Sequence, residues 1–109
     1  MSCAKAALAN FGKALSKEVA DRGVRVNTIS PGPVATDLWM GAGGVAETVA
    51  GATGGTPGDV AEHVAATSAV GRFISPVEVA DLVLYLAGDV AANITGSDFH
   101  IDGGLVTTL

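Results

Sequence analysis

Two polar side chains of this sequence stand where they could act on a bound molecule. Thr36 follows a β-branched run and the Pro-Gly-Pro turn that starts at Pro31, so its hydroxyl and nearby amides could face a diphosphate; it could instead cap a helix that begins at Asp37. Lys5 lies near the start of a predicted helix. If a tyrosine stood one helical turn before it, the lysine ammonium would lower the pKa of the tyrosine phenol. The residue one turn before it is Met1, whose thioether has no proton to give, so a solvated surface lysine is the alternative interpretation.

The other nucleophiles and titratable rings lack partners at a useful spacing. Ser30 has no histidine and acid that can be placed beside it, so we interpret it as a strand-end hydroxyl. His63 falls in a short predicted helix and His100 in a predicted strand, and we interpret both as packing or surface histidines. Cys3 is interpreted as a small residue of a helix face. One cysteine cannot form an internal disulfide, and no Cys/His cluster has metal-ligand spacing, so no metal site is predicted.

Residues 1–23 predict the amphipathic helix that positions Lys5. Large apolar residues recur every three or four positions, which places them on one stripe of a helix, and Gly23 stands where a helix-ending glycine is expected. A second face carries small residues that let another helix approach closely, so we expect one side on a sheet and one side on a partner. The stripe consists of Ala4, Leu8, Phe11, Leu15 and Val19, and the small face of Cys3, Ala6, Ala7, Asn10 and Ala14.

Residues 24–29 form a β-branched run that predicts a strand leaving this helix, the αβ half of a βαβ unit. Pro31 and Gly32 are expected to end the strand, because proline cannot donate to a ladder. Ligands of doubly wound folds bind at such a carboxyl end. Seven glycines between residues 41 and 58 make the segment 37–72 a predicted mobile cover rather than core, either a lid over a substrate or a loose loop.

Helix signals recur in the rest of the chain, but strand signals are few. A start signal at Thr56-Pro57-Gly58-Asp59 and a capping box at Ser75-Pro76-Val77-Glu78 each open a predicted helix. Three or four helices with only two strands do not make a self-sufficient parallel sheet, so the chain looks like the end of a larger fold. These further elements are expected at Val45–Ala50, Val60–Ala66, from Pro76 to Gly88, and, as a strand, at 97–101 before Asp102-Gly103-Gly104.

The composition limits the classes of function. With 49% hydrophobic and 16% charged residues the 109-residue chain is typical of a globular protein, and a net charge of -5 argues against nucleic-acid binding through a basic surface. No apolar run approaches the roughly 18–20 residues that span a bilayer, and lysines interrupt any apolar stretch near the N-terminus. A cytoplasmic location is therefore expected.

Taken in order, these motifs resemble the short-chain dehydrogenase/reductase family from Ser2 to Gly104. The start of the first helix is similar to the family's active-site helix, with Lys5 at the lysine and Met1 at the tyrosine of its Tyr-x-x-x-Lys pattern. Further on, Val26–Gly32 resembles the strand and turn beside the nicotinamide, Val34-x-Thr36 the segment that binds the nicotinamide amide and the diphosphate, and Arg72–Gly104 the last helix, last strand and tail.

The resemblance implies an α/β fold, the C-terminal part of a doubly wound, Rossmann-like parallel sheet truncated before the dinucleotide fingerprint. It implies NAD(P)-dependent hydride transfer between an alcohol and a carbonyl, a small-molecule alcohol or carbonyl substrate, NAD or NADP as cofactor without a choice between them, and a homo-oligomer, either a dimer or a tetramer. The implied catalytic residue is Lys5, and the implied cofactor-binding residues are Lys5, Pro31, Gly32, Val34 and Thr36.

On this reading, residues 1–109 form one partial domain. Its parts are an active-site and interface helix at 1–23, a strand and Pro-Gly turn at 24–36, a glycine-rich lid at 37–72, and the last helix, strand and tail at 73–109. The family's glycine-rich fingerprint and its catalytic serine and asparagine would lie upstream of Met1. Two alternatives to an oxidoreductase stay open: a catalytically inactive fragment that acts only in subunit association, and a truncated reading frame that does not fold alone.

Overall fold

The computed structural model describes residues 3–107. This part of the chain divides into two compact units, which are described separately below. The first comprises the described residues of Met1–Ser30 with Asp81–His100, and the second those of Pro31–Ala80 with Ile101–Leu109. That the chain forms one partial domain remains a prediction.

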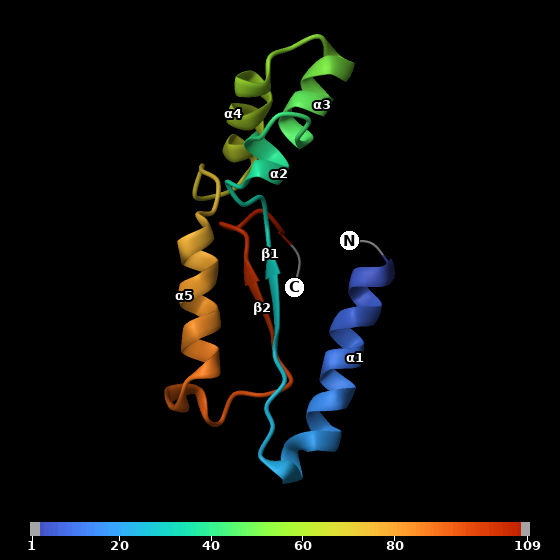
Figure 1. Cartoon of the computed structure of the whole chain (residues 1–109), viewed down its shortest axis with the longest axis vertical. Helices are drawn as coiled ribbons and strands as arrows, with labels where there is room; N and C mark the ends of the chain where they lie inside the picture. The colour runs from blue at the N-terminus through green and yellow to red at the C-terminus, as the bar shows by residue number, and fades with distance from the viewer. Residues whose placement is uncertain (1–2, 108–109) are drawn as a thin grey trace. The chain divides into compact units, whose positions relative to one another are not determined.

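The described residues form five α-helices, two short 3-10 helices and two strands, which is more helix than the sequence predicts. They are α1 Cys3–Val19, η1 Ala20–Arg22, β1 Thr28–Pro31, α2 Asp37–Met40, α3 Val45–Thr53, α4 Pro57–Thr67, α5 Pro76–Ala87, η2 Asp89–Ala91 and β2 Asp98–Ile101 (Figure 1).

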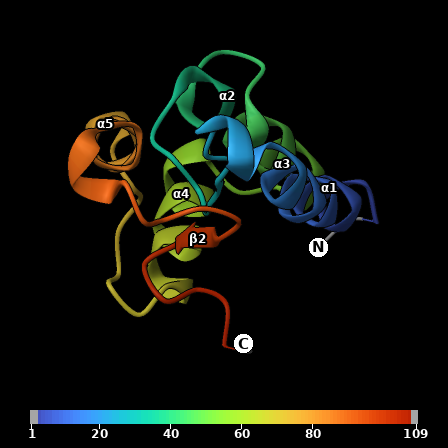
Figure 2. The same ribbon diagram turned by 90° about the horizontal axis from the view of Figure 1, so that it is seen from below.

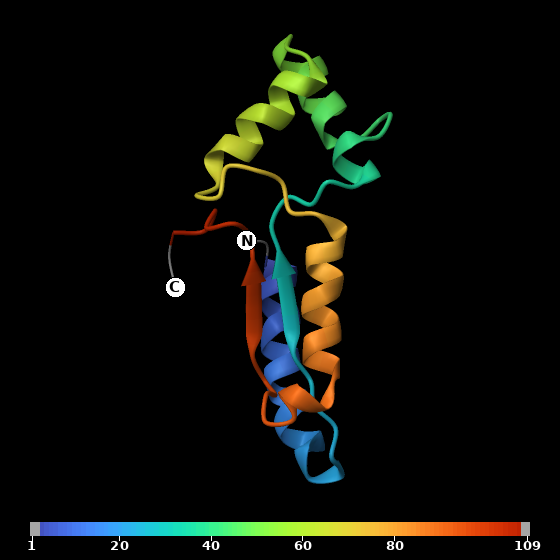
Figure 3. The same ribbon diagram turned by 90° about the vertical axis from the view of Figure 1, so that its left-hand side faces the viewer.

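In the first unit, the two strands lie side by side as a two-stranded sheet and point the same way (Figure 3). The Thr28 amide donates to the Ser97 carbonyl at 2.8 Å, and the Gly96 amide donates to the Val26 carbonyl at 2.7 Å. In the view from below, α1 and the end of α5 lie on opposite sides of β2 (Figure 2). A Cβ on Gly12 would lie 3.0 Å from the Thr28 hydroxyl, so a larger residue there would push α1 away from β1.

The first strand begins four residues later than predicted, at Thr28 instead of residue 24. Side chains, together with the backbone hydrogen bond from the Gly96 amide to the Val26 carbonyl, hold the residues before it. The Val26 amide donates to the Thr95 hydroxyl at 3.1 Å, and the Asn27 side chain donates to the Ile94 carbonyl at 2.9 Å. The Asn27 side chain also accepts from the Ser97 amide at 3.2 Å, so asparagine and threonine replace ladder contacts here.

The strand also runs two residues beyond its predicted end at residue 29, because it includes Pro31. Successive amides of a strand point to opposite edges. The Gly32 amide donates to the Ile101 carbonyl at 3.0 Å, so Pro31 lacks its N–H at a position that faces away from β2. The proline therefore removes no hydrogen bond from the pair.

Arg25 joins the end of α5 to the turn before β2 within the first unit. Its guanidinium donates to the carbonyls of Leu86 at 2.7 Å, Gly88 at 3.2 Å and Ile94 at 3.2 Å. The last carbonyls of a helix have no partner inside the helix, and a cation next to them interacts favourably with the helix dipole. Arg25 thus satisfies groups that are far from it in the sequence.

The apolar stripe of α1 is only partly covered. Leu8 and Phe11 are 63% and 62% exposed, whereas the buried residues of this helix are Gly12 and Ser16. Gly23 has a φ of 74° and its amide donates to the Ala20 carbonyl, so it ends the helical region as predicted. A two-stranded sheet is too narrow to cover side chains of this size.

In the second unit, the glycine-rich segment is largely helical. Its glycines lie mostly between α2, α3 and α4, and α3 packs against α4. Ala46 and Ala50 of α3 are only 2% and 3% exposed, so the prediction that this segment contributes no core was wrong for α3. Small side chains bury easily where two helices approach closely, and composition alone did not reveal this pairing. The Thr56 hydroxyl accepts from the Asp59 amide at 3.2 Å, which confirms the predicted start of α4.

Candidate functional site

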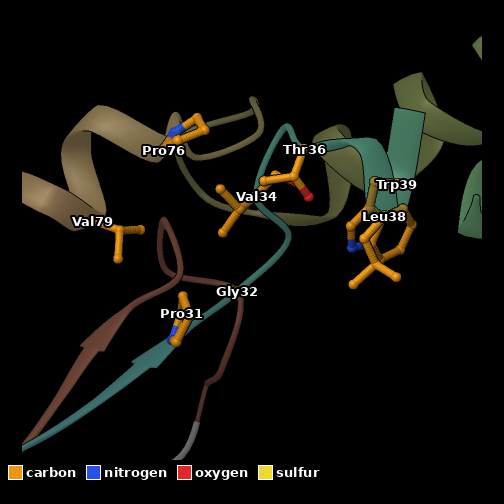
Figure 4. A pocket seen from close by; sticks show the side chains of 8 residues that line it. All are labelled: Pro31, Gly32, Val34, Thr36, Leu38, Trp39, Pro76 and Val79. Atoms are coloured by element: carbon orange, nitrogen blue, oxygen red, sulfur yellow. The ribbon is translucent and has the colours of Figure 1, made fainter. Parts of the chain in front are cut away.

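A pocket of about 400 Å³ lies within the second unit, beyond the carboxyl end of β1 (Figure 4). This volume falls at the lower end of the range of small-molecule sites, roughly 300–1,000 Å³. Leu38 and Trp39 stand at one end of the pocket in Figure 4, and Pro76 and Val79 of α5 stand near the other. The lining residues are Pro31, Gly32, Val34, Thr36, Leu38, Trp39, Pro76 and Val79.

A short parallel bridge fixes the segment that leaves β1. Val34 pairs with Ile74: the Ala35 amide donates to the Ile74 carbonyl at 2.8 Å, and the Ile74 amide donates to the Pro33 carbonyl at 3.0 Å. Ile74 is 5% exposed, which anchors the bridge in the core of this unit. The bridge therefore holds the pocket wall against the start of α5.

Gly32 is required by a close backbone approach. A Cβ at this position would lie 3.0 Å from both Cα and Cβ of Asp102. The Pro-Gly signal thus has a packing cause in addition to any role in binding, since an added Cβ would be in unusually tight contact with Asp102.

Val34 and Thr36 form a tight turn that presents polar atoms. The Thr36 amide donates to the Val34 carbonyl at 2.8 Å, and the Thr36 hydroxyl approaches the same carbonyl at 3.4 Å. The Val34 amide takes part in none of the hydrogen bonds found among residues 3–107, so it can donate to a ligand. Thr36 occupies the N-cap position of α2, but its side chain makes no capping hydrogen bond.

Different interactions support the two ends of the pocket. The rings of Trp39 and Phe73 lie 5.6 Å apart between centroids and are tilted by 57°. At the start of α5, the Ser75 amide donates to Glu78 at 2.9 Å and the Glu78 amide donates to the Ser75 hydroxyl at 3.3 Å, so the predicted capping box is confirmed. Arg72 donates to both carboxylate oxygens of Glu78, at 2.6 and 3.0 Å.

This ion pair shifts the pKa of both partners. The hydrogen bond from Arg72, followed by that from the Ser75 amide, lowers the pKa of Glu78 from 4.5 to about 2. The same hydrogen bond raises the pKa of Arg72 above its ordinary value. Both groups stay charged at neutral pH and compensate each other.

Four of the five predicted site residues line this one pocket: Pro31, Gly32, Val34 and Thr36. Lys5 lies exposed on α1 in the first unit and is not among the lining residues. Met1, the residue at the position of the phenol, lies outside the described residues.

Sequence reasoning missed four residues of the wall: Leu38, Trp39, Pro76 and Val79. Pro76 carried a signal for the start of a helix and Val79 one for the apolar face of that helix, but neither signal indicated a binding site. The apolar side chains after Thr36 had no periodicity that would mark them as lining residues.

The other candidate groups take local roles. The Ser30 hydroxyl donates to Asp98 at 2.8 Å, and the His100 ring lies 3.6 Å from the same carboxylate, so the acid stands between serine and histidine. That order does not activate the hydroxyl, because a nucleophile needs the base as its direct neighbour. Cys3 is exposed.

Within residues 3–107 there is no cluster of three or more His, Cys, Asp and Glu residues that could hold a metal ion. Among the helices of this same stretch, none combines the length and the apolar character that crossing a membrane requires.

The pocket wall fits a nicotinamide ring. Its lining offers flat apolar contact from Pro31, Gly32 and Val34, one hydroxyl from Thr36, and the available amide of Val34 as a donor for a carboxamide oxygen. The dihydropyridine ring of a reduced nicotinamide, with its carboxamide, needs that combination of apolar surface with a few directed polar groups.

Comparisons with known proteins agree with this geometry. The family described as Enoyl-(Acyl carrier protein) reductase matches residues 1–106. The 3-oxoacyl-(acyl-carrier-protein) reductase FabG of Escherichia coli is 36% identical over 104 residues, which are 95% of this chain and 37% of that protein. The chain thus spans well under half the length of such relatives.

Solved structures give the same result. A short chain dehydrogenase family protein from Francisella tularensis superimposes with a TM-score of 0.88 at 31% identity, over 95% of this chain and 42% of that one. L-sorbose reductase from Gluconobacter frateurii, solved with NADPH and L-sorbose, gives a TM-score of 0.85 at 35% identity, over 96% and 39%. The fold is α/β, and the matched region is part of a doubly wound, Rossmann-like parallel sheet. The related proteins use NAD(P)H. From its matched residues and its structure, the chain belongs to the short-chain dehydrogenase/reductase family.

Proposed function

We propose that this chain supplies the nicotinamide-binding side of an NAD(P)-dependent oxidoreductase that interconverts a small alcohol and its carbonyl compound. One observation carries the proposal: Pro31, Gly32, Val34 and Thr36 line a single pocket in a chain matched to the family over residues 1–106. When bound, the reduced nicotinamide would supply a hydride to the carbonyl carbon, and the carbonyl oxygen would take up a proton.

The chain's own residues would bind and orient the cofactor. Pro31 and Gly32 would lie flat against the ring, and the Val34 amide would donate to its carboxamide oxygen. The Thr36 hydroxyl would face the diphosphate, and the Lys5 ammonium would hold the ribose hydroxyls. Met1 has no proton to give, so the chain's own residue at the tyrosine position would not protonate the substrate.

The test of this proposal is a titration with NADPH and, separately, NADH, followed by the fluorescence of the reduced nicotinamide. Lys5→Ala should weaken binding by about ten-fold, as expected for the loss of one charge-assisted hydrogen-bonding group. Lys17→Ala is the matched control, because Lys17 is an exposed lysine of the same helix. Equal binding by both variants would remove Lys5 from the site.

We further propose that residues 37–72 cover the bound substrate as a lid. The segment carries seven glycines between residues 41 and 58, and Leu38 at its start is 71% exposed. Its amides should exchange with solvent faster than those of Leu82–Leu86 in α5, and a bound cofactor should slow them. Exchange as slow as that of α5 without cofactor would argue against a lid.

Subunit association without catalysis is the second candidate. It is favoured by the small-residue face of α1, on which Ala6 and Ala14 are exposed. We propose a homo-oligomer in which the small face with Ala6 and Ala14 packs against the same helix of a second copy. Ala6→Leu and Ala14→Leu should each cost roughly 1–3 kcal/mol of association by overpacking. An unchanged oligomer in sedimentation of both variants would place the interface elsewhere.

A further inference from the structure

The chain that follows β2 forms a tight turn at residues 102–106, here called the tail turn. The Asp102 carboxylate accepts the amide of Gly104 at 2.9 Å and the amide of Val106 at 3.1 Å. Gly103 and Gly104 have φ values of 62° and 79°, which glycine adopts without steric cost. One carboxylate and two glycines therefore fix the course of this turn.

The first residue of the tail turn contacts the pocket wall in the second unit. A Cβ at Gly32 would lie 3.0 Å from both Cα and Cβ of Asp102, and the Gly32 amide donates to the Ile101 carbonyl at 3.0 Å. Gly32 lines the pocket, whereas Asp102 does not. A shift of the tail turn would therefore move a wall of the site that we assign to the nicotinamide.

The two glycines of the tail turn contact the end of the glycine-rich segment 37–72. The Val70 amide donates to the Gly103 carbonyl at 2.9 Å. A Cβ at Gly104 would lie 2.7 Å from the Cβ of Ala69, which is closer than two such atoms can approach. In Figure 3 the tail passes beneath the end of α4, the helix that Ala69 follows. This end of the segment therefore rests on a surface that only glycine provides.

The same end of the segment leads to the aromatic wall of the pocket. Phe73 follows Val70 by three positions and packs on Trp39, with ring centroids 5.6 Å apart. Trp39 lines the pocket. A displacement of Val70 would therefore reach the pocket through a few consecutive residues.

We infer that the tail turn is a positioning element that couples cofactor binding to the glycine-rich segment. Asp102 places Gly32 on one side, and Gly104 places the end of the segment on the other. The inference rests on the proposed function, because it takes Gly32 as part of the surface that the cofactor touches. A cofactor bound against Gly32 stabilises the turn, and by the reciprocity of coupled sites a disturbed contact at Ala69 weakens cofactor binding.

The contact between Ala69 and Gly104 allows a test with a rescue. Gly104→Ala puts a Cβ against Ala69 and should displace the end of the segment. Gly54→Ala is the matched control, because Gly54 has the same φ of 79° but an added Cβ there meets nothing within 4 Å. The double variant, Gly104→Ala with Ala69→Gly, keeps the backbone strain and removes the clash. It should therefore recover only if the clash itself causes the effect.

Three measurements on the 109-residue chain follow these variants. Hydrogen exchange of the Val70 amide should be about five-fold faster in Gly104→Ala, as expected for the loss of its bond to Gly103. The emission of Trp39, the single tryptophan, should shift in this variant without any cofactor. The dissociation constant for NADPH should rise about five-fold. Gly54→Ala and the double variant should stay close to the native chain in all three.

A milder substitution covers the case in which Gly104→Ala does not fold. Asp102→Asn keeps the shape of the side chain but replaces one accepting oxygen by a donor, so one of the two amide contacts of the turn is lost. NADPH binding should weaken about three-fold. Asp98→Asn is its control, because Asp98 accepts from Ser30 in the first unit and has no contact with the tail turn. Equal NADPH binding by the two Asn variants would overturn the inference.

The outcomes separate this inference from the proposed function. Faster exchange and shifted emission in Gly104→Ala, with recovery in the double variant, support the inference even if the native chain does not bind NADPH; only the proposed function then fails. Equal behaviour of Gly104→Ala and Gly54→Ala, or no recovery in the double variant, would overturn it. If the native chain and Gly104→Ala bind NADPH equally well, the inference is wrong and the proposed function stands.

Discussion

The two units of this chain are held together by different kinds of interaction. In the first unit, Arg25 and Asn27 bond to carbonyls more than sixty positions away in the sequence. In the segment from α2 to α4 of the second unit, the side-chain hydrogen bonds span three or four positions, as from the Thr48 hydroxyl to the Gly44 carbonyl and from the Gly43 amide to Glu47.

Short-range and long-range hydrogen bonds stabilise the two units in different ways. A contact over three or four positions forms as soon as its own helix forms, whereas a contact over sixty requires that both segments are already in place. The first unit should therefore respond strongly to the loss of one long-range side chain. In the helical segment of the second unit, each substitution of a helix cap or a glycine should change the free energy of unfolding by a smaller amount.

The largest effect is expected for Arg25→Ala. Three carbonyls would lose their charged donor at once, which should lower the free energy of unfolding by about 2–3 kcal/mol. Arg22→Ala is the control, because Arg22 is an exposed arginine of η1 in the same unit. Urea titration of both variants measures the difference, and equal stability would break the proposed contrast between the units.

Thr56→Ala should cost about 1 kcal/mol, the usual effect of losing a helix N-cap. The hydroxyl of Thr56 accepts the Asp59 amide, whereas Thr36 occupies an N-cap position without a capping bond. Thr36→Ala should therefore leave the free energy of unfolding nearly unchanged. A larger loss for Thr36→Ala than for Thr56→Ala would contradict the assignment of caps.

Two glycines of the second unit separate backbone effects from packing. An added Cβ meets nothing within 4 Å at either Gly43 or Gly51. Gly51→Ala lies inside α3 and should stabilise by up to about 1 kcal/mol, since alanine favours helix. Gly43→Ala should destabilise by about 1–2 kcal/mol, because Gly43 has a φ of 72°. Thermal unfolding of the two variants should shift in opposite directions.

The smallest effect concerns pH. The folded pKa of Glu78 is lowered from 4.5 to about 2, so its contribution to stability is fully present above pH 4.5. That contribution is lost as the pH falls from 4.5 towards 2, where the carboxylate is protonated in the folded state too. Unfolding at a series of pH values should show this slope for the native chain and a flatter curve for Glu78→Gln. An identical slope in both proteins would mean that other groups cause it.

Local signals determined much of what the sequence predicted correctly. The capping box at Ser75, the cap at Thr56 and the helix-ending Gly23 each require only a few neighbouring residues, and each is present. The residues Pro31, Gly32, Val34 and Thr36, which the family resemblance implied as cofactor-binding, line one pocket, and their role in binding stays a prediction.

Only the tertiary structure decided the remaining features. The start of β1 at Thr28 depends on Asn27 and Thr95, which are far apart in sequence, and the pocket wall combines Trp39 with Val79 of another helix. Burial of Ala46 and Ala50 likewise depends on how α3 and α4 meet. Caps and turns follow from the steric and hydrogen-bonding preferences of adjacent residues. These preferences can be inferred directly from the sequence. Contacts between distant segments follow from how the chain packs, and residue types alone leave many packings open.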